Sequence, residues 1–299
     1  MGPGRAVSAL GYALVTPVRD EEEHLRRLRD CVLAQTVTPR IWVIVDNGST
    51  DETVAQAETF ARTHPWIRVL QAPGENVHAR GAPVVRAFLA GLEAIDPWPE
   101  IVVKLDADVS FEPDHFVRLL RHFAVDPRLG IASSLCLEED GGRWRPRYST
   151  RSHARGAVRA YRSTCLRDVM PLEQRMGWDG IDEIKAAVRG WRSATVEDVA
   201  FLHHRQLGER EGAASRWARQ GEMAHYMGYR PSYLVFRALY RALREPAALA
   251  MVAGYVAAAV HRSPRYPDAE VRSWLRREQS LRRLPQRARE ALGRASPSL

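Results

Sequence analysis

Two aspartates separated by one small residue are the most informative candidates for chemistry in this chain. Asp106 and Asp108 directly follow the apolar run 101–105, which predicts a buried strand. A strand end is a rigid position that opens onto the ligand crevice of an α/β sheet. Two carboxylates there could hold Mg²⁺ or Mn²⁺, and such a cation could neutralise a diphosphate. An isolated Asp-x-Asp is more often a solvated acidic turn, so the rest of the chain has to decide between the two.

Two more polar clusters follow apolar runs that predict strands. Residues 12–16 lead into the polar segment 16–21, and residues 41–45 lead into the segment 46–51. The carboxyl ends of parallel strands meet at one edge of a sheet. Three clusters at such positions are therefore much harder to explain as solvated turns than one cluster alone.

Apolar residues at helical spacing separate these runs. The spacing predicts helices and further strands, with helices over 21–33, 50–61, 82–95 and 111–123 and strands over 67–71 and 129–137. Strands that alternate with helices are typical of a doubly wound α/β fold, with a mostly parallel sheet flanked by helices. The three polar clusters would then line its ligand crevice.

The second half of the chain has a different pattern. We expect a loop over 141–155, a segment over 176–189 that becomes a helix, and a strand over 196–202. From residue 215 onward the sequence predicts mostly helices. We therefore expect a catalytic domain over 1–210 and a helical C-terminal region over 211–299.

The three polar motifs together resemble those of the family 2 glycosyltransferases, which are inverting enzymes of GT-A fold. The motifs read Thr16-Pro17-Val18-Arg19-Asp20-Glu21, Val45-Asp46-Asn47-Gly48-Ser49-Thr50-Asp51 and Leu105-Asp106-Ala107-Asp108. The resemblance covers roughly residues 10–205. It implies transfer of a sugar from a UDP- or dTDP-sugar to an acceptor hydroxyl, with Mn²⁺ or Mg²⁺ as cofactor. Such an enzyme would serve cell-surface polysaccharide, glycolipid or secondary-metabolite synthesis.

Asp46 is the expected contact to the base of the nucleotide. A carboxylate at a strand end can accept a hydrogen bond from the imide N–H of uracil or thymine, a donor that cytosine lacks. The resemblance implies the same role. The alternative is a helix N-cap or an Asx turn, for which Asn47 and Ser49 are better suited.

Further expected contacts to the nucleotide-sugar come from two loops. By resemblance, Thr16, Pro17 and Arg19 belong to a loop that wraps the nucleotide. Glu21 either contacts the base or ribose or supplies a favourable charge to the first turn of the next helix. Arg80 is the expected diphosphate contact, because a glycine follows it and the N-terminus of a helix attracts anions.

The residues of the Asp-x-Asp motif have different expected roles. By resemblance, Asp108 ligates the metal directly, Asp106 reaches the ribose or a metal-bound water, and Ala107 is small because it abuts the sugar. His203 and His204 follow a predicted strand, where some GT-A enzymes place a histidine that completes the metal site. Spacing alone does not choose between these two histidines, and imidazole suits Mn²⁺ better than Mg²⁺.

An inverting transfer also needs a carboxylate that deprotonates the acceptor hydroxyl. The segment 177–183, Gly-Trp-Asp-Gly-Ile-Asp-Glu, resembles the acidic acceptor-site motif of the family, with Trp-Asp in place of the usual Glu-Asp pair. Counting back from Gly190 aligns Asp179 with the base of the family. We rank Asp179 first, Asp182 second and Glu183 third.

Bulk composition adds weaker constraints. The 44 basic and 36 acidic side chains give a net charge of +8, which suits phosphorylated ligands or anionic membrane surfaces. The three cysteines form no Cys-x-x-Cys pair, which favours free thiols in the cytoplasm. The apolar run 247–260 is shorter than the roughly 20 residues needed to span a bilayer. Arginines within 237–265 predict peripheral contact with the inner face of the membrane, and the alternatives are a packed helical cap, an acceptor platform or a homo-oligomer interface.

Two other functions compete with glycosyl transfer. A sugar-nucleotide pyrophosphorylase would show a glycine-rich loop after the first strand, and segment 16–21 contains no glycine. A non-catalytic basic module that binds nucleic acid would explain the charge. It would leave three acidic strand ends unexplained, since carboxylates repel phosphates unless a metal intervenes. We therefore expect no nucleic-acid partner. The sugar and the acceptor are not determined by these motifs.

Overall fold

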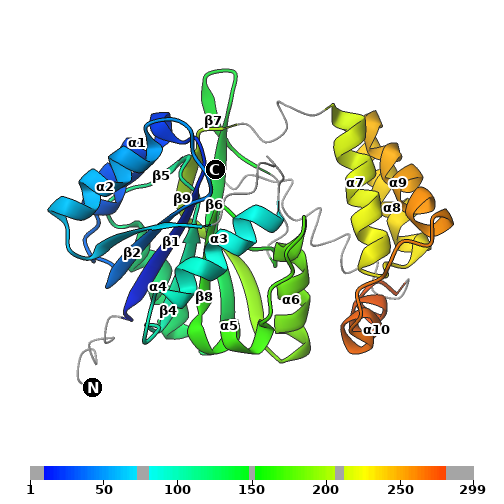
Figure 1. Cartoon of the computed structure of the whole chain (residues 1–299). Helices are drawn as coiled ribbons and strands as arrows, with labels where there is room; N and C mark the ends of the chain where they lie inside the picture. The colour runs from blue at the N-terminus through cyan, green and yellow to red at the C-terminus, as the bar shows by residue number, and fades with distance from the viewer. Residues whose placement is uncertain (1–9, 73–80, 148–151, 206–211, 281–299) are drawn as a thin grey trace. The chain divides into compact units, whose positions relative to one another are not determined.

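The computed structural model describes residues 10–72, 81–147, 152–205 and 212–280. The chain forms two compact units, Met1–Arg205 and Gln206–Leu299. The first unit contains the sheet with its helices, and the described part of the second unit contains only helices (Figure 1).

The first unit is built on a nine-stranded sheet in the order β3-β2-β1-β4-β8-β6-β9-β5, with β7 paired to β6. Its parallel core consists of β1 (Tyr12–Val18), β2 (Ile41–Asp46), β3 (Ile67–Gln71) and β4 (Ile101–Leu105). The other strands are β5 (Val109–Ser110), β6 (Leu129–Asp140), β7 (Arg143–Pro146), β8 (Val158–Arg162) and β9 (Arg192–His203). Strand β8 runs antiparallel to its neighbours β4 and β6, whereas β6 and β9 are parallel. The prediction of a mostly parallel sheet is confirmed.

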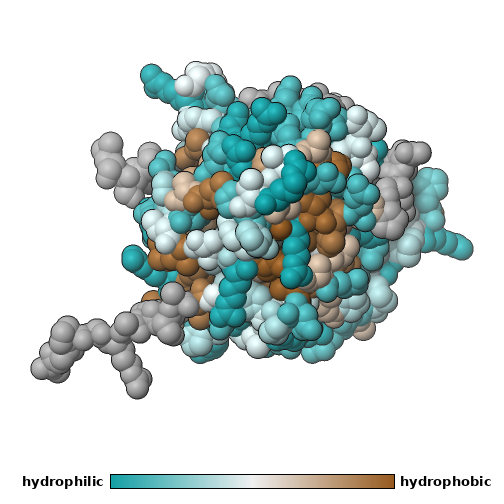
Figure 2. Space-filling model, turned by 60° about the vertical axis from the view of Figure 1, so that its left-hand side comes forward, coloured by the Kyte–Doolittle hydropathy of each residue, from teal (hydrophilic) through white to brown (hydrophobic). Residues whose placement is uncertain are grey.

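Six helices cover the two faces of this sheet, and the alternation of side chains along a strand explains how both faces are buried. In β1, Tyr12 and Leu14 join one core, and Ala13 and Val15 join the other. The first core also receives α1 (Glu22–Leu33), α2 (Thr53–Thr63) and α4 (His115–Val125). The second receives α3 (Ala82–Glu93), α5 (Ser163–Val169) and α6 (Trp178–Val188). On the face shown in Figure 2, hydrophobic residues form separate patches among hydrophilic ones.

Several local predictions differ from the structure, among them the start of the helix predicted over 111–123, since α4 begins only at His115. The predicted loop over 141–155 is wrong for its first part, because 143–146 forms β7 and pairs with an extended β6. Gly141 and Gly142 have φ values of 59° and 77°, the left-handed conformations that a tight hairpin turn requires. Helix α2 begins at Thr53 rather than at residue 50. The residues before it are engaged in hydrogen bonds to the loop after β1.

The second unit contains α7 (Ala213–Tyr226), α8 (Pro231–Ala242), the 3₁₀ helix η1 (Pro246–Leu249), α9 (Ala250–Val260) and α10 (Ala269–Glu278). The prediction of mostly helices from residue 215 onward is confirmed as far as residue 280, where the described part of the chain ends, and the apolar run 247–260 falls in η1 and α9. None of the described helices combines the length and the apolar character needed to cross a membrane. Helices α7 and α9 pack closely at two glycines. A Cβ atom on Gly221 would lie 1.9 Å from the Met251 carbonyl oxygen, and one on Gly254 would lie 2.0 Å from that of Ala218.

Candidate active site

The first two polar clusters lie together because β1 and β2 are adjacent, with Val18 in register with Asp46. Backbone N–H groups of one loop bond to side chains of the other. Asp20 N donates to Ser49 Oγ over 3.0 Å, and Thr50 N donates to the Asp20 carboxylate over 2.8 Å. Asp20 has a φ of 52°, a conformation that non-glycine residues adopt at a cost. These contacts give the predicted nucleotide loop a defined shape.

Asp46 takes part in the turn that follows β2. The carboxylate is buried and accepts hydrogen bonds from Gly48 N and Ser49 N, each over 3.1 Å. The expectation that Asn47 and Ser49 would suit this turn better was wrong, because Asp46 itself fills it. Each oxygen retains a lone pair, so the turn leaves Asp46 able to accept a further hydrogen bond from a ligand.

The other residues of the first loop differ in exposure. Thr16 is fully buried, and its Oγ1 accepts a hydrogen bond from Trp42 Nε1 over 2.9 Å. The Thr16 side chain therefore helps to hold β1 against β2 in the interior of the protein. Pro17, Arg19 and Glu21 are partly exposed. Arg80, the predicted diphosphate contact, lies outside the described residues.

The Asp-x-Asp motif follows β4, as predicted. Ala107 is buried in the first core, and Asp106 keeps about a third of its side chain exposed. Lys104, which is 3% exposed, donates from Nζ to Asp106 and, over 2.9 Å, to the carbonyl oxygen of Gly156. A buried lysine is costly unless it is paired. The side chain of Lys104 thus reaches the site and holds Asp106 in place.

Asp108 faces His203, which ends β9. The distance between His203 Nε2 and Asp108 Oδ1 is 3.4 Å, and the distance between His203 Nδ1 and Glu138 Oε1 is 3.5 Å. Asp108 Oδ1, Glu138 Oε1 and His203 Nδ1 are all buried and make no hydrogen bond within the described residues. Each of these atoms lies 3.4–3.5 Å from a neighbour in the cluster without forming a hydrogen bond. Buried polar atoms of this kind are rare in proteins and call for an explanation, such as a bound ion or water. A carboxylate oxygen beside an imidazole nitrogen is a donor set that fits a divalent cation such as Mn²⁺.

The charges of this cluster reinforce one another. Burial opposes the ionisation of Asp108, but His203 and Arg205 outweigh it and hold the pKa of this carboxyl below its usual value. Burial likewise opposes the charging of His203, but Asp108 and Glu138 raise its pKa to about 9. The cluster thus concentrates negative charge that a bound cation or a proton neutralises.

His204 has a different environment from His203. Its Nε2 lies 2.7 Å from Ser110 Oγ, and its ring packs edge-on against Trp144 at a centroid distance of 5.3 Å. Its backbone N–H donates to the Asp108 carbonyl oxygen over 2.9 Å. Of the two histidines, His203 is therefore the one whose ring faces the Asp108 carboxylate.

Arg205 joins the nucleotide loop to the Asp-x-Asp motif. Its two terminal nitrogens each lie 2.8 Å from an oxygen of Glu21, and its Nε lies 3.8 Å from Asp108 Oδ2. Burial raises the pKa of Glu21 to about 7 even though Arg205 favours the ionised form. Arg205 is about half exposed, so it places positive charge at the rim of the site.

The three candidate bases have unequal access. Asp182 is 1% exposed, and its two oxygens accept hydrogen bonds from Arg159 and from the Tyr161 hydroxyl. Burial raises the pKa of Asp182 to about 7, a value that would suit a base. A general base must also lie within hydrogen-bond reach of the acceptor hydroxyl, and the burial of Asp182 prevents that. Glu183 accepts from Ala154 N over 2.7 Å and contacts His153 and Arg159.

Asp179 is the remaining candidate, in the first turn of α6. It is partly exposed, and its Oδ1 accepts a hydrogen bond from Gly180 N over 3.0 Å. Its Oδ2 lies 3.8 Å from the position that a Cβ atom would take on Gly156. The carbonyl oxygen of Ala157, the residue after Gly156, accepts a hydrogen bond from Asp106 N over 2.8 Å. Asp179 therefore lies beside the segment that borders the Asp-x-Asp motif.

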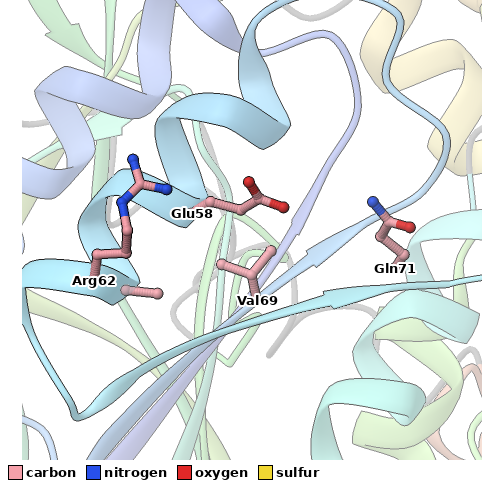
Figure 3. A pocket seen from close by; sticks show the side chains of 5 residues that line it. Glu58, Arg62, Val69 and Gln71 are labelled. Carbon is pink, nitrogen blue, oxygen red and sulfur yellow. The ribbon is translucent and has the colours of Figure 1, made fainter.

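Sequence reasoning missed Glu138 as a member of this site. Glu138 lies one residue beyond the predicted strand 129–137, as the first of three consecutive acidic residues, and this acidic strand end is the signal that could have found it. Trp178 is buried against the Arg159 guanidinium. A hollow at the sheet edge, lined by Glu58, Ala61, Arg62, Val69 and Gln71, shares no residue with this site (Figure 3).

Known proteins with related sequences or folds agree with this architecture. The sequence profile of Glycosyl transferase family 2 matches residues 13–171. An uncharacterized glycosyltransferase, YibD of Escherichia coli K12, is 24% identical over 202 residues, which are 65% of this chain and 54% of that protein. The chain thus matches about half the length of this curated relative.

Solved structures with a similar fold are also glycosyltransferases. The mannosyltransferase PcManGT from Pyrobaculum calidifontis, in complex with GDP-Man and Mn²⁺, superposes with a TM-score of 0.59 at 20% identity, covering 96% of this chain and 88% of that one. GalNAc-T7 with UDP, GalNAc and Mn²⁺ gives 0.57 at 14% identity, covering 73% and 48%. S. aureus TarS 1–349 with UDP gives 0.52 at 17%, covering 71% and 64%. These likenesses establish the GT-A fold, and because the family profile spans more than half of the chain, the protein belongs to glycosyltransferase family 2.

Proposed function

We propose that this glycosyltransferase is metal-dependent and inverting, and that it moves a sugar from a UDP- or dTDP-sugar to an acceptor hydroxyl. The observation that carries the proposal is the pair Asp108 and His203, two buried residues whose Oδ1 and Nε2 atoms lie 3.4 Å apart beside the nucleotide loop. A divalent cation held by these two residues would supply positive charge to the diphosphate leaving group.

The residues of the chain divide the remaining work. Asp46 accepts the imide N–H of the base, and Asp106, oriented by Lys104, contacts the ribose. Pro17, Arg19 and Glu21 border the nucleotide, while Arg80 and Arg205 stabilise the diphosphate. Asp179 takes the proton of the acceptor hydroxyl, whose oxygen bonds to the anomeric carbon as the bond to the diphosphate breaks.

The donor proposal is tested by nucleotide binding. We expect UDP and dTDP to bind the full-length protein in the presence of Mn²⁺ and at least about tenfold more weakly with EDTA, because the diphosphate then lacks its counter-charge. Calorimetric titration with UDP, dTDP, CDP and GDP gives the preference. PcManGT was solved with GDP-Man, so tighter binding of GDP than of UDP would contradict the proposed role of Asp46. Equal binding with and without metal would contradict the metal.

We also propose that the helical unit contacts an anionic membrane surface from the cytoplasmic side. Helix α8 and its C-cap residue carry a row of exposed apolar side chains. The exposed fraction of each residue is between 39% and 83%, and the residues are Val235, Phe236, Leu239, Tyr240 and Leu243. Arg237, Arg241 and Arg244 are interleaved with them. This combination is typical of helices that lie in a lipid interface. A homo-oligomer interface is the alternative use of the same face.

Sedimentation with lipid vesicles tests this contact. We expect binding to phosphatidylglycerol vesicles but not to phosphatidylcholine vesicles, and a loss of about tenfold or more in the double variant Phe236→Glu/Leu239→Glu, since burying each side chain contributes roughly 1.5–3 kcal/mol. Val125→Glu replaces an exposed apolar residue in the first unit and should bind like the wild type. A double variant that keeps its lipid binding but changes its oligomeric state would support the alternative.

A further inference from the structure

The ring of His203 lies between two carboxylates that come from different elements. Its Nε2 faces Asp108 after β4, and its Nδ1 faces Glu138 on β6. The three side chains are only 6%, 10% and 12% exposed. The placement follows from the sheet, because Glu138 and His203 are in register on the parallel strands β6 and β9. The pairing of β6 with β9 therefore places Glu138 beside His203.

A neutral imidazole carries a proton on one ring nitrogen, so only the other nitrogen is able to bind a metal. A carboxylate can only accept hydrogen bonds, so a carboxylate beside Nδ1 favours the tautomer with its proton on Nδ1. Metal-binding histidines in proteins almost always donate their second ring N–H in this way, and the partner fixes the orientation of the ring. Glu138 has the position that such a partner needs.

We propose that Glu138 is a positioning residue that accepts the Nδ1–H of His203 and leaves Nε2 available, with Asp108, for the divalent cation. This inference rests on the metal site of the proposed function. Glu138 does not touch the donor or the acceptor in this role. It acts through the ring of His203 alone.

Glu138 is itself held in place by the hairpin of β6 and β7. Its Oε2 pairs with the guanidinium of Arg147, which follows β7, and its Oε1 faces His203. The oxygens thus have separate partners, and Oε1 is the buried atom that makes no hydrogen bond within the described residues. The ion pair with Arg147 restricts Glu138 to a rotamer that faces the imidazole.

A direct metal set of Cys136, Glu138 and His203 is the competing arrangement, since their ligand atoms lie within 4.8 Å of one another. It would need the thiolate of Cys136 and would suit a softer ion such as Zn²⁺. That set makes no use of the buried Asp108 Oδ1, which lies 3.4 Å from His203 Nε2 and makes no hydrogen bond within the described residues. The positioning role uses all three orphaned atoms.

Mn²⁺ titration of the full-length protein without donor tests the inference, with free Mn²⁺ measured by electron paramagnetic resonance. We expect Glu138→Met to weaken Mn²⁺ binding about 10–100-fold. Glu138→Gln should stay within a few-fold of wild type, because its amide oxygen can still accept the Nδ1–H. Glu139→Met makes the same chemical change at the exposed neighbouring position and should leave Mn²⁺ affinity unchanged. Circular dichroism checks that each variant is folded.

The possible failures are distinguishable. A wild-type protein that binds no Mn²⁺ contradicts the metal site, and the role of Glu138 with it. Wild-type affinity in folded Glu138→Met overturns the positioning role and leaves the metal site intact. Equal losses in Glu138→Gln and Glu138→Met would assign Glu138 as a direct ligand and also overturn the inference. Recovery in Glu138→Gln alone supports it.

Discussion

Replacing Asp179 with asparagine is expected to lower turnover by roughly 10²–10⁴-fold, the usual contribution of a general base, while UDP binding stays unchanged. Asparagine keeps the shape of the side chain and the oxygen that accepts from Gly180 N, but it cannot take the proton of an acceptor hydroxyl. Release of UDP from the donor sugar measures turnover, and titration with UDP and Mn²⁺ measures binding.

Asp182→Asn is the matched control, because it makes the same change one helical turn away. Asp182 and Arg159 form an ion pair in which both side chains are almost fully buried. Removing one partner of such a pair typically costs about 3–5 kcal/mol. We expect Asp182→Asn to lower the denaturation midpoint and Asp179→Asn to leave it near that of the wild type. Full activity in Asp179→Asn would exclude it as the base, and a stable but inactive Asp182→Asn would transfer the role to Asp182.

Replacing Asp108 with asparagine is expected to abolish the Mn²⁺ dependence of UDP binding and to lower turnover by about 1,000-fold. The change removes one negative charge from the predicted metal site, and a cation contributes several kcal/mol to the stabilisation of a charged transition state. Asparagine is nearly isosteric, so we expect the β4–β5 turn to keep its fold. Mn²⁺ titration and UDP titration, each with and without EDTA, measure the two effects.

Asp106→Asn serves as the comparison within the same motif. Lys104 forms an ion pair with Asp106, whereas Asp108 faces the imidazole of His203, the second proposed ligand. We therefore expect Asp106→Asn to weaken metal binding much less than Asp108→Asn does. The reverse order would exchange the roles assigned to the two aspartates.

The elements that create the crevice could be predicted from local patterns. Strands β1, β2 and β4 are mostly apolar runs followed by polar residues, and the helices between them show apolar residues at helical spacing. Strand β8 was not predicted. It is inserted antiparallel between β4 and β6, and such long-range pairing has no local sequence signal. The β7 hairpin had a signal in Gly141-Gly142 that the predicted loop overlooked.

The candidate site was clearest in the sequence where one segment supplies the chemistry, whereas the histidines at the end of β9 were assigned to it only through the family resemblance. The motifs at Asp46 and at Asp106 and Asp108 were visible because their residues are contiguous. Glu138 meets His203 only through the register of β6 and β9. The sequence could rank Asp179 above Asp182 only by counting. The two carboxylates differ in their access to an acceptor, because Arg159 on β8 donates a hydrogen bond to the Asp182 carboxylate.

The close contact between α7 and α9 bears on how relatives of this protein can be recognised. Any larger side chain at Gly221 or Gly254 would meet the backbone of the opposite helix. A sequence that keeps both glycines within two helical segments after a family 2 domain is thus expected to share this C-terminal unit, even when its arginines differ. The two glycines are a requirement of the α7–α9 contact that does not depend on the catalytic motifs. They could sort family members by the type of C-terminal region attached to their common domain.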